Sequence, residues 1–291
     1  MSDAATRVFA ILGHPVRHSL SPRMHNEAFH HLGLNAIYVA FDVTAEEFST
    51  ALNGAAALGF GGLNITIPHK QAAFHLLERR DSSAELTGAV NTICFGEDGP
   101  KGYNTDMPGF LAALEEAFGA GPRDRKVFLL GAGGAGRAVA FACATAGASM
   151  LTICDIDTSR ARHLAREVGE KTGHPAVLSV QPQEKNTAVR EADLVVNATP
   201  VGMHKDDVSP IESQLFREQQ WVYDVIYVKP VTPFMQAAAA AGALTANGLG
   251  MLLHQGAEAF RLWTGREPPI PIMRRALEAA VYGNDGAETS G

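Results

Sequence analysis

The chain has 291 residues, of which 46% are hydrophobic and 19% are charged, and its formal net charge is −7. This length exceeds one typical domain and predicts two, each able to bury a core. The negative charge argues against nucleic acid or an anionic membrane as a partner, because both require a basic face. The N-terminus lacks the apolar core of a signal peptide and no segment has the length of a membrane span, so we expect a cytoplasmic protein.

Strand and helix patterns alternate through the first hundred residues. Strands are predicted at 8–12, 36–43, 62–67 and 89–95. Ser21 is predicted to be the N-cap of a first helix, because proline follows it. Thr44 and Glu47 predict a capping box for a second helix, and a third is expected near 69–77. Asp106 is predicted to cap the helix that follows the fourth strand.

The second half of the chain repeats a strand–helix unit. It begins after a linker at 119–125 that is rich in Gly, Pro and charged residues. Strands are predicted at 127–130, 150–154, 176–180, 193–197, 221–226 and 243–246. This alternation predicts a doubly wound parallel sheet of the Rossmann type. Helical patterns at 249–264 and 272–282 have no strands of their own, so we expect them to pack on the first domain.

A glycine-rich turn follows the strand at 127–130. Gly131, Gly133 and Gly136 form a Gly-x-Gly-x-x-Gly pattern between that strand and an Ala-rich helix. Glycines in this context make a tight turn, admit a pyrophosphate and let the helix pack on the strand. The first N–H groups of the helix then hold the diphosphate. The segment predicts a site for a nicotinamide or flavin dinucleotide.

The residue after the next strand bears on the choice of dinucleotide. Asp155 lies 155 − 131 = 24 residues after the first glycine, about where a carboxylate accepts hydrogen bonds from the adenosine ribose. A carboxylate there repels a 2′-phosphate, so NAD is favoured over NADP. Two alternatives stay open: Asp155 or Asp157 caps the helix near residue 159, and Arg160 with Arg162 permits some use of NADP.

Polar residues in the first domain stand where secondary structure does not require them. Ser19 and Ser21 lie at a helix N-terminus, a place that favours an anion such as a carboxylate, although Ser21 could be a cap alone. Asn64 and Thr66 share one face of a strand, and Asn91 occupies a similar place in another. Asn is disfavoured within strands, so these side chains suggest a site for a small polyol or hydroxyacid at a domain boundary.

A set of motifs in fixed order resembles the shikimate dehydrogenase family, and within it the quinate/shikimate dehydrogenases. The matching segments span nearly the whole chain. They are Gly13-His-Pro-Val-Arg-His-Ser-Leu-Ser-Pro-Arg-Met-His-Asn, Gly62-Leu-Asn-Ile-Thr-Ile-Pro-His-Lys, Gly88-Ala-Val-Asn-Thr, Asn104-Thr-Asp, Gly131-Ala-Gly-Gly-Ala-Gly, Asn197-Ala-Thr-Pro-Val-Gly-Met, Asp224-Val-Ile-Tyr and Asn247-Gly-Leu-Gly-Met-Leu-Leu-His-Gln.

The resemblance implies a role for particular residues. Lys70 and Asp106 would be the catalytic pair that moves the hydroxyl proton. The substrate, shikimate or quinate or their keto forms, would be bound by Ser19, Ser21, Asn64, Thr66, Asn91, Tyr227 and Gln255. The dinucleotide would be held by Gly131, Gly133, Gly134, Ala135, Asp155, Arg160, Asn197, Thr199, Val225 and Gly248. NADP-using members usually carry Asn-Arg-Thr where this chain has Asp155-Ile-Asp, which supports the NAD-using branch.

The predicted architecture is an α/β fold of two domains. Residues 1–106 would bind substrate and 107–248 the dinucleotide, while 249–283 would complete the first domain and 284–291 form a disordered tail. The histidines lack metal-site spacing, so no metal is expected. Open alternatives are an NADP-specific shikimate dehydrogenase, an aminoshikimate dehydrogenase and a non-catalytic metabolite sensor. A monomer and a homodimer are equally open.

Overall fold

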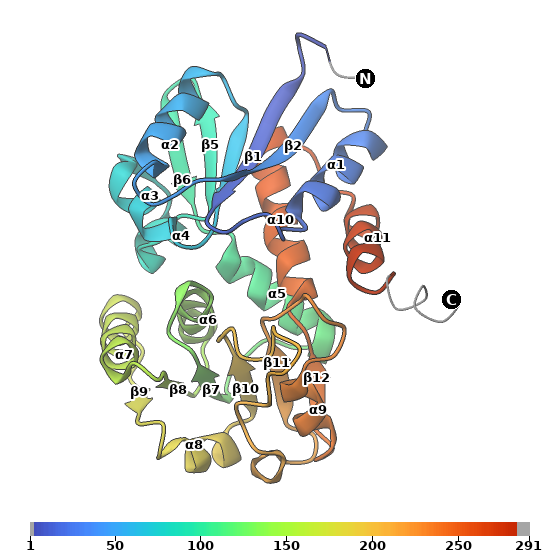
Figure 1. Cartoon of the computed structure of the whole chain (residues 1–291). Helices are drawn as coiled ribbons and strands as arrows, with labels where there is room; N and C mark the ends of the chain where they lie inside the picture. Colours follow the sequence, from blue (N-terminus) through green and yellow to red (C-terminus); the bar gives the residue numbers. More distant parts are fainter. Residues whose placement is uncertain (1–2, 284–291) are drawn as a thin grey trace. The chain divides into compact units, whose positions relative to one another are not determined.

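The computed structural model describes residues 3–283, so the tail predicted at 284–291 lies outside the described residues. The chain divides into two compact units (Figure 1). One unit comprises the chain up to Thr105 together with the chain from Leu253, and the other is Asp106–Leu252. Each unit is an α/β structure built around one sheet, which confirms the predicted fold class.

The first unit contains a mixed sheet with strand order β2-β1-β3-β5-β6-β4. Strands β2, β1 and β3 are parallel, whereas β5 runs antiparallel to both β3 and β6. The strands are β1 (Arg7–Gly13), β2 (Ala36–Asp42), β3 (Gly62–Ile65), β4 (Arg79–Arg80), β5 (Thr92–Gly96) and β6 (Gly99–Tyr103). The helices are α1 (Ser21–His31), α2 (Phe48–Ala57), α3 (Lys70–Leu76), α4 (Ser82–Thr87) and α11 (Ile270–Val281), together with α10 (Leu249–Thr264) from Leu253 onward.

Two predicted helix starts in this unit are wrong. Ser21 is the first residue of α1 rather than its N-cap, because Leu20 occupies the cap position in a helical conformation and makes no side-chain cap. The predicted capping box also fails: Thr44 Oγ1 donates to the Glu47 carboxylate (3.1 Å), and α2 begins only at Phe48. At Thr44 a bond between two side chains replaces the expected bond to a helix N–H.

The last strands of this sheet also differ from prediction. β5 begins at Thr92 rather than residue 89, and it forms a hairpin with β6, which the sequence did not indicate. The sequence of β6, Gly-Pro-Lys-Gly-Tyr, has poor strand propensity. Pairing with β5, in which Phe95 opposes Pro100, holds it extended.

Helix α10 packs closely on the sheet of the first unit. Trp263 Nε1 donates to the Ile93 carbonyl (3.0 Å), and its ring lies 5.1 Å from that of Phe9. A Cβ at Gly62 would come within 2.1 Å of Trp263 Nε1, so the indole requires glycine at that position of β3. Burial of these rings stabilises the join between α10 and the strands.

The edge strand β2 is partly covered by a side chain of α1. Asn26 Nδ2 donates to the Tyr38 carbonyl (2.9 Å), and Asn26 Oδ1 accepts from the Tyr38 N–H (2.8 Å). The amide thereby satisfies both backbone groups that Tyr38 presents at the sheet edge. Tyr38 itself is buried, with its ring directed into the unit.

The second unit contains a parallel sheet with strand order β12-β11-β10-β7-β8-β9. The order reverses at the neighbours β7 and β10, which is the arrangement of a doubly wound dinucleotide-binding sheet. The strands are β7 (Lys126–Leu130), β8 (Met150–Cys154), β9 (Val177–Val180), β10 (Leu194–Asn197), β11 (Trp221–Asp224) and β12 (Leu244–Ala246). The helices are α5 (Asp106–Phe118), α6 (Gly134–Thr145), α7 (Thr158–Thr172), α8 (Lys185–Glu191) and α9 (Pro233–Ala239).

A buried histidine lies in the aromatic core of the first unit. The His25 ring stacks on Tyr38 with 4.5 Å between ring centroids and also lies against Trp263. Among residues 3–283, neither ring nitrogen has a hydrogen-bond partner. Burial lowers the pKa of His25 to about 3, because the apolar surroundings disfavour the charged ring.

This histidine makes folding stability sensitive to acid. Below its ordinary pKa of 6.5, His25 takes up a proton in the unfolded chain but not in the folded one. The free energy of unfolding therefore falls as pH falls from about 6.5 to about 3, by about 1.4 kcal/mol per pH unit from this group. We expect His25→Leu to remove that slope in urea unfolding measured between pH 7 and 4. An unchanged slope in the variant would assign the acid sensitivity to other groups.

Candidate functional site

A network of buried amides and hydroxyls lies at the ends of β3 and β5. Asn64 Oδ1 accepts from the Tyr38 hydroxyl (2.7 Å), while Asn64 Nδ2 donates to the Asn91 carbonyl (3.1 Å) and to Thr92 Oγ1 (3.0 Å). Both N–H bonds of this amide are thus used inside the protein. Asn64 can offer a ligand only the remaining lone pair of Oδ1, so it would accept a hydrogen bond from a substrate hydroxyl.

Asn91 is the centre of the same network. Its Oδ1 accepts from the Thr105 N–H (2.8 Å), and its Nδ2 donates to Thr105 Oγ1 (2.9 Å). The same Nδ2 lies 3.5 Å from Gln255 Oε1 on α10. The structure therefore brings together three residues predicted to contact substrate: Asn64, Asn91 and Gln255.

The two serines lie beside the N-terminus of α1. Ser19 Oγ accepts from the Ser21 N–H (3.3 Å), and Ser21 is buried. Burial raises the pKa of Tyr38 well above its usual range, and a hydrogen bond with Ser21 opposes that rise. Tyr38 therefore links Ser21 to Asn64. Its place in an apolar strand pattern gave the sequence analysis no signal of this role.

Thr66 follows directly after β3 and lies against β1. Its N–H donates to the Leu12 carbonyl (2.9 Å), which continues the pairing of the two strands. A Cβ at Gly13 would lie 2.3 Å from the Thr66 methyl group, so this close approach depends on the glycine. Thr66 is half-buried and lies at the same end of the sheet as Asn64, which precedes it by two residues.

Lys70 is the first residue of α3 and is half-buried. Its carbonyl accepts from the Val90 N–H (2.9 Å), which ties the start of the helix to the residue before Asn91. The preceding residue, His69, is buried, bonds the Val43 carbonyl through Nε2 (2.7 Å) and stacks on a phenylalanine. This anchor, which the sequence analysis missed, fixes the backbone that carries Lys70.

Asp106 is the first residue of α5 and is buried. It follows Thr105 directly in the chain, and Thr105 is held by Asn91 through two hydrogen bonds. The backbone that leads into Asp106 is therefore fixed by the amide network. Thr105 lay within a motif that the sequence analysis quoted, but its role was not predicted.

The glycines of the turn after β7 divide into two kinds. A Cβ at Gly136 would lie 2.0 Å from the Gly131 carbonyl, and Gly131 itself has φ +103°. These two glycines are required by the protein's own packing. A Cβ at Gly133 or Gly134 would meet nothing within 4 Å. That open space lies in front of the first turn of α6, where Gly133 makes no side-chain cap and Ala135 follows, so the turn fits a diphosphate.

The carboxylate of Asp155 is buried and braces the glycine turn. Its Oδ2 accepts from the Ala132 N–H (2.7 Å), and its Oδ1 accepts from the Asp157 N–H (2.8 Å). The cap of α7 is Asp157, which accepts from the N–H groups of Ser159 and Arg160. The alternative that Asp157 caps this helix is therefore correct. Asp155 keeps lone pairs that could accept ribose hydroxyls.

The residues near Asp155 differ in exposure. Ile156 is 95% exposed, which is unusual for a large apolar side chain. The Arg160 guanidinium lies 3.6 Å from the Asp157 carboxylate in an exposed pair. A pair of this kind contributes little to stability, so Arg160 can reorient at small cost.

The ends of β10 and β11 bring four predicted cofactor residues together. Asn197 Oδ1 accepts from Thr199 Oγ1 (2.7 Å), and the Asn197 carbonyl accepts from the Val225 N–H (3.0 Å). A Cβ at Gly248 would lie 2.0 Å from the Val225 carbonyl, so glycine permits this contact. Tyr227 follows in the same loop, and burial raises the pKa of its hydroxyl.

Asp224, the last residue of β11, was not predicted as a site residue. Its side chain is fully buried between Asn197 and the loop that carries Tyr227. Burial raises the pKa of this carboxyl to about 6, although hydrogen bonds from Thr232, Ile226 and Asn197 oppose the rise. The signal for it was present, since Asp224 opens one of the motifs that carry the family resemblance.

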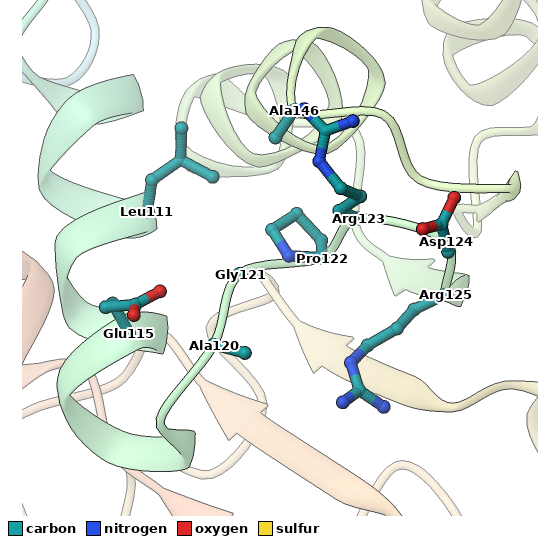
Figure 2. Close-up of a pocket in the computed structure, with 9 residues that line it drawn as sticks. All are labelled: Leu111, Glu115, Ala120, Gly121, Pro122, Arg123, Asp124, Arg125 and Ala146. Carbon is teal, nitrogen blue, oxygen red and sulfur yellow. The ribbon is translucent and has the colours of Figure 1, made fainter.

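A shallow cavity of about 480 Å³ surrounds the loop between α5 and β7 (Figure 2). Its lining includes Leu111, Pro122 and Arg123, and Figure 2 shows the Arg123 side chain extending toward Ala146. The loop precedes β7, so this cavity lies at the opposite end of that strand from the glycine turn. It is therefore separate from the dinucleotide half-site.

Two further searches cover residues 3–283. Within that range, no cluster of three or more His, Cys, Asp or Glu side chains has an arrangement that could hold a metal ion. None of the helices described there combines the length and apolarity needed to cross a bilayer.

The two kinds of glycine can be separated by substitution. We expect Gly133→Ala to fold with an unchanged melting temperature, because its Cβ meets open space, yet to lose about tenfold or more in dinucleotide affinity. Gly136→Ala should lower the melting temperature, because its Cβ would collide with the Gly131 carbonyl. Calorimetric unfolding and fluorescence titration with NADH and NADPH measure both effects. If Gly133→Ala binds the dinucleotide as tightly as the parent, the diphosphate does not bind at this turn.

Known families match most of the chain. Residues 11–93 match the shikimate dehydrogenase substrate binding domain, and residues 248–278 match the shikimate 5′-dehydrogenase C-terminal domain. Between them, residues 126–222 match a domain described as NADP oxidoreductase, coenzyme F420-dependent. The two shikimate dehydrogenase matches fall in the unit that holds the amide network.

Similar proteins cover nearly the full length. The shikimate dehydrogenase (NADP(+)) of Methanopyrus kandleri is 48% identical over 94% of this chain and 96% of its own. A crystal structure of shikimate dehydrogenase in complex with NADP+ matches with a TM-score of 0.90 at 41% identity, covering 97% of this chain and 98% of the other. Quinate dehydrogenase from Corynebacterium glutamicum in complex with NAD matches with a TM-score of 0.89 at 36% identity, covering 94% and 99%.

These matches confirm the resemblance carried by the motifs. The relatives are nicotinamide-dependent oxidoreductases, and their sequence identity and coverage are high enough to establish the family. The chain therefore belongs to the shikimate dehydrogenase family.

Proposed function

We propose that this protein interconverts shikimate and 3-dehydroshikimate with a nicotinamide dinucleotide. The observation that carries the proposal is the hydrogen-bonded network of the buried Asn64 and Asn91, beside which the half-buried Gln255 lies. Such a network suits a ring that bears several hydroxyl groups. The names of the relatives, shikimate dehydrogenase (NADP(+)), support the same substrate.

Each half-site supplies a distinct part of the proposed complex. Ser19 and Ser21 would bind the substrate carboxylate at the N-terminus of α1, where helix N–H groups favour an anion. Asn64, Thr66, Asn91 and Gln255 would bind the ring hydroxyls. Tyr227 would lie near the carboxylate or the nicotinamide. The turn at Gly131–Ala135 with Asp155 would hold the dinucleotide, and Asn197, Thr199, Val225 and Gly248 would line its cleft.

The proposed chemistry needs one proton-transfer group. When bound, the nicotinamide ring accepts a hydride from the ring carbon or returns it. Lys70 Nζ would take the hydroxyl proton during oxidation and donate it to the carbonyl oxygen during reduction. Asp106 would orient the Lys70 amine and share the hydrogen bonds to the reacting oxygen. The alcohol thus loses a hydride and a proton to separate acceptors, and the charges balance.

Removal of the Lys70 amine tests this assignment. We expect Lys70→Ala to lower kcat by about 10²–10⁴-fold, because general acid–base assistance is lost. Dinucleotide affinity should stay the same, since Lys70 lies in the first unit and the glycine turn in the second. Steady-state oxidation of shikimate measures the first quantity, and fluorescence titration measures the second.

Lys101→Ala is the matched control for this experiment. Lys101 lies on β6 in the same unit, with its ammonium 5.2 Å from the centre of the Tyr103 ring. We expect this variant to keep kcat within about twofold of the parent. A kcat for Lys70→Ala that matches the control would exclude Lys70 from proton transfer.

The cofactor preference has two candidates. The names of the relatives favour NADP(+), which makes the NADP-dependent reaction the first candidate. The second is a preference for NAD, favoured by the buried Asp155 carboxylate and by Ile156, which replaces the arginine usual in NADP-using members. The quinate dehydrogenase in complex with NAD shows that the fold also serves that cofactor, and quinate is the corresponding second substrate.

A substrate and cofactor matrix separates these candidates. We expect kcat/KM to be higher for shikimate than for quinate with either cofactor. Ile156→Arg should raise the NADP+/NAD+ ratio of kcat/KM by about tenfold, because a guanidinium at this exposed position can pair with the 2′-phosphate. Ile156→Gln, which adds no charge, serves as the control. If Ile156→Arg leaves the NADP+/NAD+ ratio of kcat/KM unchanged, the 2′-position of the ribose does not lie near residue 156.

A further inference from the structure

A fully buried carboxylate lies where β11 ends. Asp224 Oδ1 accepts from Asn197 Nδ2 (3.0 Å) and from the Ile226 N–H (3.1 Å), while Oδ2 accepts from Thr232 Oγ1 (2.6 Å). In the part of the chain that the structure describes, no lysine, arginine or histidine forms an ion pair with it. Its partners are therefore neutral groups from the end of β10 and from the segment between β11 and α9.

Such a carboxylate is costly as a structural element. A buried charge loses its hydration, and the hydrogen bonds here only partly restore it, which is why the pKa rises. An apolar residue of similar size could fill the space at lower cost. The carboxylate has a property that an apolar residue lacks: it accepts hydrogen bonds at both oxygens and donates none.

That property determines the orientation of the Asn197 amide. Because Asp224 Oδ1 only accepts, Asn197 must turn its Nδ2 toward it, and Asn197 Oδ1 must face the other way. The same Nδ2 makes a second, longer bond to the Val201 carbonyl (3.3 Å). Asn197 Oδ1 accepts from both the N–H (3.1 Å) and the Oγ1 (2.7 Å) of Thr199. With the amide reversed, two donors would face Thr199 and an oxygen would face the carboxylate.

Thr199 lies against the glycine turn. A Cβ at Gly131 would come within 3.0 Å of the Thr199 methyl group and within 2.7 Å of the Ala198 carbonyl. A shift of the segment after β10 would therefore change the contacts of Gly131. The remaining contacts of Asp224, to Ile226 and Thr232, hold the carboxylate itself, since Thr232 is buried and caps α9.

We propose that Asp224 is a positioning residue that sets the orientation of the Asn197 amide and, through it, the place of Thr199 beside the dinucleotide-binding turn. The inference rests on the proposed function in that Asn197 and Thr199 would line the cofactor cleft. Asp224 touches neither substrate nor cofactor in this arrangement. It acts through one hydrogen bond to Asn197.

The proposal predicts a selective loss of cofactor affinity. Asp224→Ala raises the Kd for NADH and NADPH by about tenfold, because Asn197 Nδ2 loses the shorter of its two hydrogen bonds and keeps only the bond to the Val201 carbonyl. The KM for shikimate stays within about twofold, since the substrate residues Asn64, Asn91 and Gln255 lie in the other unit. Asp224→Asn restores the affinity, because its carbonyl oxygen can still accept from Asn197 while its amino group turns to Thr232.

A double-mutant cycle tests the route of the effect. If Asp224 acts through Asn197, the variant Asn197→Ala/Asp224→Ala has the Kd of Asn197→Ala alone. Additive losses would overturn the proposal, as would an unchanged Kd in Asp224→Ala. If Asp224→Ala does not fold, Asp224→Leu in the same cycle provides the comparison, because an apolar side chain of that size keeps the space filled without the hydrogen bond.

Gln220 supplies a matched control at the other end of β11. It is buried, and its Nε2 donates to the carbonyls of Val189 (2.8 Å) and Ala192 (2.7 Å). Gln220→Ala removes a comparable set of hydrogen bonds far along the strand from Asp224. We expect it to lower the melting temperature without raising the cofactor Kd. If Gln220→Ala raises the cofactor Kd as much as Asp224→Ala does, general destabilisation explains both increases and the proposal is overturned.

Failure of the proposed function has a different signature. If Asn197→Ala leaves the Kd for both dinucleotides unchanged, the cofactor cleft is wrongly assigned. If Asn197→Ala raises the Kd and Asp224→Ala does not, the cleft stands and only the positioning role of Asp224 is overturned.

Discussion

The proposed substrate half-site depends on one requirement: every N–H donor of a buried amide must have a hydrogen-bond acceptor. Asn64 lies in a strand, where its side chain cannot join the ladder, and it is buried. Its two N–H bonds are therefore committed to Asn91 and Thr92, and its oxygen receives the Tyr38 hydroxyl. One lone pair is left over. The chemistry that this residue can offer a ligand follows from what its neighbours have already taken.

In the proposed cofactor half-site, residues of the same type have different roles. Gly131 and Gly136 serve the packing of the turn, whereas Gly133 and Gly134 keep space open in front of α6. Asp155 and Asp157, two residues apart, divide in the same way. Asp155 braces the turn through the Ala132 N–H, and Asp157 caps α7. The Gly-x-Gly-x-x-Gly pattern alone does not distinguish these tasks, because they depend on where each Cβ would point.

The sequence predicted the second unit more fully than the first. Strands β7 to β12 were all anticipated, since buried parallel strands leave strong apolar runs between helices. The hairpin of β5 and β6 was not, because pairing rather than propensity makes Gly-Pro-Lys-Gly-Tyr a strand. Tyr38, His69 and Asp224 escaped for a related reason. Each acts through a contact distant in the chain, and the motifs that contain His69 and Asp224 do not record that contact.

The amide of Asn26 has a consequence for self-association. β2 is an edge strand, and such edges invite a second chain to extend the sheet. At Tyr38, the third residue of β2, both outward backbone groups are already bonded to Asn26. A continuous sheet that runs from one copy into another across this edge would first have to displace the asparagine. The side chain thus opposes extension of this sheet by a second copy at Tyr38.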